Sequence, residues 1–320
     1  MTATERRLRF GVVNEVIPGR DGWIDHVHQA EDSGVDTLLI RDHIAPGPFG
    51  PQLAPLATAS AVAAHSTRLR VGTMVLSNDY RNPVLLAHEA ATIDWLSGGR
   101  LELGLGAGWL RDEYRQMGMA FDPAGTRIAR LEEAVGVIAG LLAGQTVTFR
   151  GAHYAIDSAT LPVAAAQRPR PPLMIGGGGP KMLALAGRHA DIAGILPAPI
   201  RGDEDSDDSA DRSSAALEAK LAVLRDAAGE RFAELEISTF ATFRVTSQRR
   251  HDTEDLIRQR GWQGIDCEQV WAMPMVFIGS AGQIWHDLRD RRRRYGLSYY
   301  VTSDRDLEQL AQVIAHAGAG

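Results

Sequence analysis

The chain has 320 residues and a mass of 34.7 kDa, which fits two ordinary domains or one large α/β barrel and excludes a small disulfide-stabilised protein. Because 44% of its residues are hydrophobic and only 23% are charged, it can bury a sizeable core. A net charge of −6 and a pI near 5.9 argue against nucleic acid and anionic membrane surfaces as partners.

In the first half of the chain, short apolar runs alternate with segments of helical periodicity. The first helical segment carries Trp23, Val27 and Ala30 at helical spacing. Only a crossover helix can return the chain to start a parallel neighbour, so this alternation predicts parallel strand pairing. We predict strands over 8–13, 37–40, 69–76 and 101–105, and helices over 56–64, 84–96 and 126–142.

The second half repeats the alternation after an inserted hairpin near 146–156. We predict strands over 173–175, 190–196, 236–245 and 297–302, and helices over 181–188, 214–228, 283–294 and 306–316. Eight strand–helix units predict a (β/α)8 TIM barrel, because an open doubly wound sheet usually needs only five or six strands. We therefore expect a single domain over 1–320, with insertions near 145–160 and a mobile acidic loop near 198–212.

Unusual residues follow four of the predicted strands. In a barrel the loops after the strands share one rim, so we expect these residues to meet at one mouth. The candidates after the second, third, fourth and fifth strands are Asp42 and His43; Met74, Val75 and Ser77; Leu105, Gly106, Ala107, Gly108 and Trp109; and Gly176, Gly177, Gly178, Gly179 and Lys181. This distribution is typical of a cofactor site.

The glycine run 176–179 has two interpretations. Four residues without Cβ let the backbone approach a ligand closely, and the following helix start offers N–H groups to a phosphate, next to the charge of Lys181. The other interpretation is a tight turn that needs positive φ. The glycines at 104, 106 and 108 do not have the G-x-G-x-x-G spacing of a dinucleotide fingerprint, and they instead leave room for a flat ring. Trp109 either walls that space or packs against the next helix.

His43 is the candidate catalytic residue. An imidazole at a strand end can exchange a proton near neutral pH, so His43 is either a proton donor to the substrate or a hydrogen-bonding partner of the cofactor. Asp42 is adjacent and can position a polar ring edge. The single cysteine, Cys267, has no histidine near it in the sequence, so we expect no role for it as a nucleophile, and no spacing of ligands predicts a metal site.

The residues of three segments resemble the luciferase-like oxidoreductase superfamily. These segments are 69–76, 81–83 and 89–109. Three motifs resemble the branch of this superfamily that uses coenzyme F420, a deazaflavin. They are Ser97-Gly98-Gly99-Arg100, Pro172-Leu173-Met174-Ile175-Gly176-Gly177 and Ala190-Asp191. The resemblance extends from Phe10 to Val301 and weakens in the acidic loop and around 249–274.

The resemblance implies a barrel whose mouth holds the deazaflavin. The ring would lie near Asp42, His43 and a bulge at Met74-Val75, which in relatives carries a non-proline cis peptide. By position, Ser77, Leu105 and Gly106 are similar to residues that contact the cofactor in relatives. The run 176–179 is similar to the residues that hold the phosphate-bearing tail. Sugar-phosphate dehydrogenase members have an acid/base glutamate just after the fourth strand, where this chain has Ala107, which argues against that substrate.

We therefore expect an F420-dependent oxidoreductase that transfers a hydride between a reduced deazaflavin and a small organic substrate. The alternatives are an FMN-dependent luciferase-like monooxygenase and a non-catalytic cofactor-binding barrel. Relatives pair through the helices after the second and third strands, and the small side chains of Ala57, Ala61 and Ala64 predict a homodimer of the same kind. The single cysteine and the charged start of the chain predict a cytoplasmic location with no membrane span.

Overall fold

Eight parallel strands close into a barrel in the computed structural model, which describes residues 6–47, 49–196, 200–201, 204–205 and 209–318. The barrel strands are β1 (Arg9–Val13), β2 (Thr37–Ile40), β3 (Arg70–Thr73) with its continuation β4 (Leu76–Ser77), β5 (Leu101–Gly106), β8 (Leu173–Gly177), β9 (Ile192–Ile195), β12 (Glu236–Phe240) and β15 (Leu297–Ser303). Each strand pairs in parallel with its neighbour along the chain, and β15 pairs with β1. The predicted TIM barrel is confirmed.

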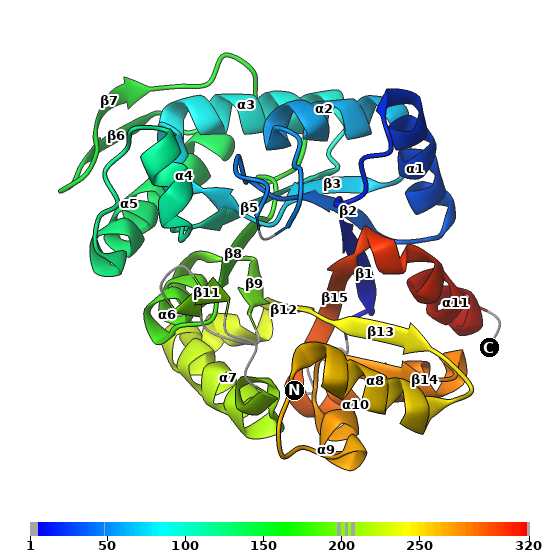
Figure 1. Cartoon of the computed structure of the whole chain (residues 1–320). Helices are drawn as coiled ribbons and strands as arrows, with labels where there is room; N and C mark the ends of the chain where they lie inside the picture. The colour runs from blue at the N-terminus through cyan, green and yellow to red at the C-terminus, as the bar shows by residue number, and fades with distance from the viewer. Residues whose placement is uncertain (1–5, 48, 197–199, 202–203, 206–208, 319–320) are drawn as a thin grey trace.

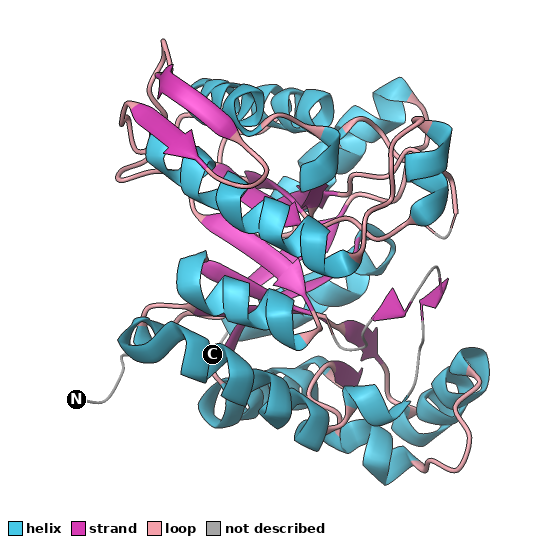
Figure 2. Ribbon diagram, turned by 90° about the vertical axis from the view of Figure 1, so that its left-hand side faces the viewer, coloured by secondary structure: helices cyan, strands magenta, loops and turns pink. Residues whose placement is uncertain are grey.

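The helices form the outer layer around the barrel (Figure 1). They are α1 (Arg20–Asp32), α2 (Pro55–His65), α3 (Pro83–Leu96), α4 (Arg111–Gln116), α5 (Ala124–Leu142), α6 (Pro180–His189), α7 (Ser214–Ala228), α8 (Arg249–Arg260), α9 (Cys267–Ala272), α10 (Ala281–Tyr295) and α11 (Leu307–Gly318). Short 3-10 helices are η1 (Asn78–Tyr80), η2 (Ser209–Arg212), η3 (Gly229–Ala233) and η4 (Asp304–Asp306). The turned view in Figure 2 places a two-stranded hairpin, β6 (Val147–Arg150) and β7 (Ala155–Ala159), outside the barrel, as predicted.

Two apolar clusters fill the barrel and its surroundings. The larger one lies between strands and helices and includes the fully buried Leu38, Leu103 and Leu173. The smaller one contains Val13, Leu39, Met174, Ile192, Tyr299 and Val301, and the half-buried Met74, Val75 and Phe240 pack against it. Because successive side chains of a strand point to opposite faces, burial on both faces gives the continuous apolar runs seen in the sequence.

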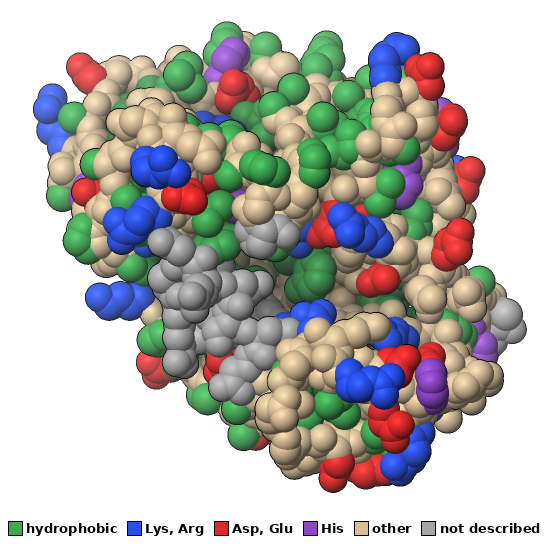
Figure 3. Space-filling view, in the orientation of Figure 1, with side chains coloured by type: hydrophobic (Ala, Val, Ile, Leu, Met, Phe, Trp, Pro, Cys, Tyr) green, Lys and Arg blue, Asp and Glu red, His purple; other side chains and the backbone are tan. Residues whose placement is uncertain are grey.

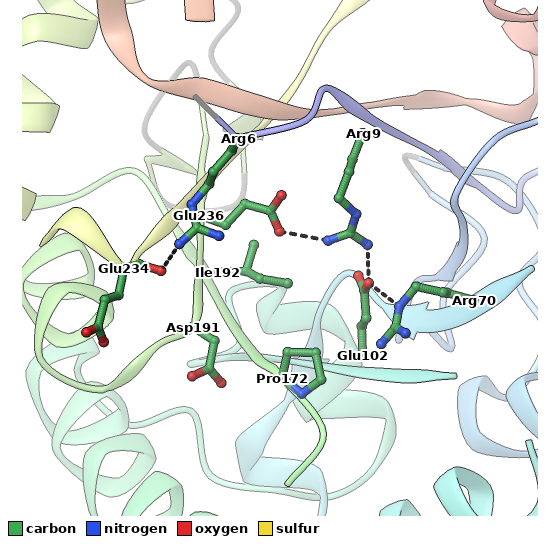
Figure 4. A pocket seen from close by; sticks show the side chains of 9 residues that line it. All are labelled: Arg6, Arg9, Arg70, Glu102, Pro172, Asp191, Ile192, Glu234 and Glu236. Carbon is green, nitrogen blue, oxygen red and sulfur yellow. Dashed lines mark hydrogen bonds and ion pairs between the residues drawn. The ribbon is translucent and has the colours of Figure 1, made fainter. Parts of the chain in front are cut away.

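The amino-terminal ends of the strands are closed by a charged network beside a cavity of about 360 Å³ (Figure 4). Arg9 pairs with the buried Glu102 and, at 2.7 Å, with Glu236, and Arg70 Nε lies 2.6 Å from Glu102 Oε1. The hydroxyl of Tyr299 donates to Glu102 Oε2 at 3.2 Å. These side chains pair with one another, so their charges are compensated within the protein.

One predicted strand is wrong in its extent. The run 236–245 breaks at Ala241, whose N–H still donates to Val301 in the barrel, whereas the N–H of Thr242 donates to Met275. The second half, β13 (Thr242–Val245), therefore leaves the barrel and pairs in parallel with β14 (Val276–Gly279). Together with α8 and α9 these strands enclose a small core of their own, which includes Leu256 and Trp262.

The predicted acidic loop lies partly outside the described residues. Its described parts are β10 (Ile200–Arg201) and β11 (Glu204–Asp205), which pair antiparallel, and η2. Within the described part of the chain no helix is both long and apolar enough to cross a membrane.

Candidate functional site at the barrel mouth

The carboxyl ends of neighbouring strands bring the predicted site residues together. The backbone N–H of Ser77, at the end of β4, donates to Asp42 after β2 at 2.9 Å. A Cβ built on Gly106 of β5 or on Gly176 of β8 would lie 2.6 Å or 3.0 Å from Val75. The space-filling view in Figure 3 shows a hollow near the centre of one face, with hydrophobic side chains at its floor.

The bulge between β3 and β4 has the predicted geometry. The Met74–Val75 peptide bond is cis, although Val75 is not proline. The Val75 side chain fits only because its neighbours lack side chains: a Cβ on Gly104 would lie 1.9 Å from the carbonyl oxygen of Thr73 and 3.2 Å from Val75. Glycines at 104, 106 and 176 therefore let the bulge stand inside the barrel mouth.

His43 is held by a buried carboxylate that the sequence analysis missed. Nδ1 of His43 lies 3.1 Å from Oε1 and 3.2 Å from Oε2 of Glu113, which stands on α4 and is almost fully buried. The same carboxylate accepts hydrogen bonds from the N–H groups of Ile44 (2.7 Å) and Ala45 (3.1 Å) and from the hydroxyl of Tyr80 (2.9 Å). Glu113 thus fixes both the histidine ring and the backbone that follows it.

These contacts shift the pKa values of the groups involved. Burial alone would raise the pKa of Glu113, but the hydrogen bonds from His43 and Ala45 hold it below its usual range, so the carboxylate stays ionised. Burial, and then the Glu113 carboxylate, raise the pKa of Tyr80. Nδ1 is therefore the ring nitrogen of His43 that faces the carboxylate, and Nε2 is the one that Glu113 does not contact.

Two aromatic rings enclose His43. The ring centroid of Phe49 lies 4.9 Å from that of His43 and is tilted by 36°, and Trp109 stands edge-on at 5.9 Å. Phe49 and Trp109 are themselves 6.4 Å apart. Trp109 therefore faces the mouth rather than packing against the following helix, and Phe49 is a second ring residue that the sequence analysis did not single out.

Both oxygens of Asp42 accept hydrogen bonds from protein groups. Arg81 donates to them with both terminal nitrogens, one of which lies 2.9 Å from Oδ1. The backbone N–H of Ser77 also donates to Oδ2. This bidentate pair holds the end of β4 against the loop after β2. Asp42 thus contributes by positioning Ser77 in the mouth.

The side chains after β5 point in different directions. Leu105 is fully buried in the core between barrel and helices, and the half-buried Ala107 packs against the same core. Gly108 has a positive φ of 73°, and a Cβ there would lie 2.1 Å from the Tyr114 hydroxyl and 2.6 Å from Ser77 Oγ. That hydroxyl of Ser77 is buried beside Tyr114 but makes no well-formed hydrogen bond to the described residues.

The glycine run leads into a helix start without a side-chain cap. Gly179 is the N-cap residue of α6, with φ of −85°, and the cap makes no side-chain hydrogen bond to the N–H groups of the first turn. Neither Gly176 nor Gly177 has positive φ, so the tight-turn interpretation does not explain them. A Cβ on Gly177 would lie 2.6 Å from Met182, whereas one on Gly179 would meet open space. Lys181 is exposed in the first turn, and together these groups can receive an anion.

The described residues hold no group of three or more histidine, cysteine, aspartate or glutamate side chains that could bind a metal ion. Cys267 is buried, and burial raises the pKa of its thiol, which lowers the fraction present as thiolate.

The sequence matches the model of a known family, described as luciferase-like monooxygenase, over residues 14–317. Among curated relatives, an F420-dependent glucose-6-phosphate dehydrogenase of Intrasporangium calvum is 30% identical over 288 residues, 83% of this chain and 84% of the relative. Proteins of the same name from Amycolatopsis mediterranei and Nakamurella multipartita are 31% and 38% identical, over 63% and 51% of this chain. Those two alignments span 65% and 48% of the relatives' own length.

Solved structures share the fold at low sequence identity. A coenzyme F420 dependent tetrahydromethanopterin reductase from Methanopyrus kandleri is 20% identical, with a TM-score of 0.72 over 97% of this chain and 99% of that chain. An EDTA monooxygenase from Chelativorans sp. BNC1 is 15% identical, with a TM-score of 0.76 over 98% of this chain and 94% of that chain.

Proposed function

Because the chain belongs to the luciferase-like monooxygenase family, we propose that it is an oxidoreductase that uses coenzyme F420 to transfer a hydride to or from a small organic substrate. The relatives that it matches at 30–38% identity are named F420-dependent dehydrogenases. The observation that carries the proposal is the His43–Glu113 pair, which stands at the same barrel mouth as the glycine run.

The residues of the mouth fit a deazaflavin with a phosphate-bearing tail. The half-buried Val75 offers an apolar surface for a flat ring, and the buried hydroxyl of Ser77 is available to a polar ring edge. The open space at Gly179, the uncapped start of α6 and Lys181 together suit the anionic tail. When bound, the coenzyme supplies a hydride donor or acceptor carbon.

The protein's own residues supply the proton and exclude water. Glu113 orients His43 so that Nε2 exchanges a proton with the substrate, as general acid in the reducing direction and as general base in the other. Phe49 and Trp109 cover the imidazole and keep water from it. A substrate carbon held beside the ring then gains or loses the hydride without competition from solvent.

Coenzyme binding and turnover test this proposal separately. Titration with oxidised F420, followed by its fluorescence, should give saturable binding, and titration with FMN should give much weaker binding. His43→Ala should lower kcat by about 10²-fold or more, in line with the usual value of general acid–base catalysis, and should change the Kd of F420 by less than about threefold. His286→Ala, an exposed histidine on α10, is the matched control. Tight FMN binding with oxygen consumption would contradict the coenzyme assignment.

We also propose that the chain forms a homodimer through α2 and α3. Leu85, Trp95 and Leu96 expose 63%, 59% and 59% of their surface on one side of α3. Ala57 and Ala64 on the adjacent α2 are exposed too, so a second copy can approach closely. Trp95→Glu should shift sedimentation from dimer to monomer, and equal sedimentation of both proteins would contradict this interface.

A further inference from the structure

The surroundings of His43 are apolar on the side that its carboxylate partner does not occupy. Phe49 and Trp109, which we call the aromatic wall, lie within 6 Å of the His43 ring centre. The Arg41 guanidinium lies 4.1 Å from the ring centre of Phe49 and 5.7 Å from that of Phe240 at the end of β12. A substrate beside the His43 ring can therefore lie against Phe49 and Trp109. Flat apolar groups gain the most from such contact.

Three arginines around the mouth already have carboxylate partners. Arg41 pairs with Glu15, and its guanidinium lies 4.1 Å from the centre of the Phe49 ring. Arg81 is held by both oxygens of Asp42. Arg130, which faces the mouth segment η1, lies 2.9 Å from Asp79. The charges of these three cations are thus neutralised within the protein.

A phosphorylated substrate would meet an unfavourable environment beside His43. The ionised carboxylate of Glu113 adds a negative charge, and a phosphate would have to compete with Glu15, Asp42 or Asp79 for these three arginines. Drawing an arginine away from a buried carboxylate such as Asp42 or Asp79 weakens an existing ion pair, which offsets the gain from a new one. The site therefore selects against anions at this position.

We propose that the substrate is a neutral, flat, apolar carbonyl compound, such as an aryl ketone, that stacks on the aromatic wall. The inference rests on the proposed function. In the reducing direction the carbonyl carbon accepts the hydride from reduced F420 while the C=O π bond breaks, and the oxygen takes the proton from Nε2 of His43. The ketone becomes a secondary alcohol, the coenzyme is oxidised by two electrons, and solvent restores the proton on His43.

Equilibrium binding tests the substrate class without turnover. Acetophenone and glucose 6-phosphate are titrated by calorimetry into the enzyme saturated with oxidised F420. We expect acetophenone to bind and glucose 6-phosphate to bind at least tenfold more weakly. Phe49→Ala and Trp109→Ala should each weaken acetophenone binding by about tenfold, the value of a lost aromatic contact. Phe232→Ala, a half-buried ring on η3 packed on Arg225, is the matched control and should not change it.

Steady-state rates and F420 titration of the same variants separate the two proposals. With reduced F420 the enzyme should reduce acetophenone, and Phe49→Leu, which keeps an apolar side chain, should restore part of the affinity lost in Phe49→Ala. Stronger binding of glucose 6-phosphate than of acetophenone, or acetophenone binding that neither wall variant changes, would overturn the substrate class. Absence of F420 binding would instead contradict the proposed function, and with it the inference that rests on it.

Discussion

Replacing Glu113 by glutamine tests whether this carboxylate positions His43. In the wild type, Oε1 accepts the N–H groups of Ile44 and Ala45, while Oε2 faces the Tyr80 hydroxyl at 2.9 Å and Nδ1 of His43 at 3.2 Å. The glutamine oxygen can keep the backbone contacts and an uncharged hydrogen bond to Nδ1 at the Oε1 position, 3.1 Å away, but its NH2 group then faces the Tyr80 hydroxyl and Nδ1 of His43. We expect the free energy of unfolding to fall by about 1.5–3 kcal/mol, the value of one hydrogen bond to a charged group, because the tyrosine hydroxyl can rotate away.

The effect on catalysis should be larger than the effect on coenzyme binding. Without the negative charge, and with an NH2 donor 3.2 Å from Nδ1, the His43 ring is no longer held in the orientation and tautomer needed for proton transfer, so kcat should fall by about 10²-fold. Oxidation of reduced F420 by a ketone is followed optically, and nitrogen NMR reports the tautomer of His43. Tyr80→Phe removes one hydrogen bond from the same carboxylate without touching His43, and should cost much less activity. Unchanged kcat and an unchanged His43 spectrum in Glu113→Gln would refute the positioning role.

Three further predictions concern the bulge, acid stability and the coenzyme tail. Gly106→Ala places a Cβ 2.6 Å from Val75, so urea unfolding should show a loss of about 1–3 kcal/mol and F420 titration a weaker Kd. Glu31 accepts hydrogen bonds from the backbone N–H groups of residues 67–69, and these lower its pKa to about 2 although burial alone would raise it. The free energy that ionised Glu31 contributes to folding is complete above pH 4.5 and disappears as the pH falls towards 2. Glu31→Gln should therefore flatten the fall in stability over that pH window. Lys181→Ala should raise the Kd of F420 and reduce its salt dependence while leaving kcat nearly unchanged.

Alternation of strands and helices was enough to predict the barrel, because each unit carries its own periodicity. The break at Ala241 was not predictable in this way, since 236–245 reads as one continuous strand and only the partner of Thr242 shows that the chain leaves the barrel. The helix α8 was missed because its sequence is strongly polar and shows little amphipathic periodicity. Its burial against β14 is decided by tertiary contacts.

The site was predictable where residues sit directly at strand ends. His43, Ser77 and the glycine run 176–179 follow strands, so the barrel geometry alone brings them to one mouth. Glu113 was missed because a glutamate in a short polar helix normally faces solvent. Only the fold shows that it turns inward to His43, although its place four residues after Trp109, behind the fourth predicted strand, is a signal in retrospect.

A crystal structure of the enzyme with oxidised F420 tests the central claim most directly. We expect the deazaflavin ring against Val75, with His43 within reach of the bound substrate and the phosphate-bearing tail at Gly179 and Lys181. A ring bound elsewhere on the molecule, or a tail that avoids the start of α6, would contradict it.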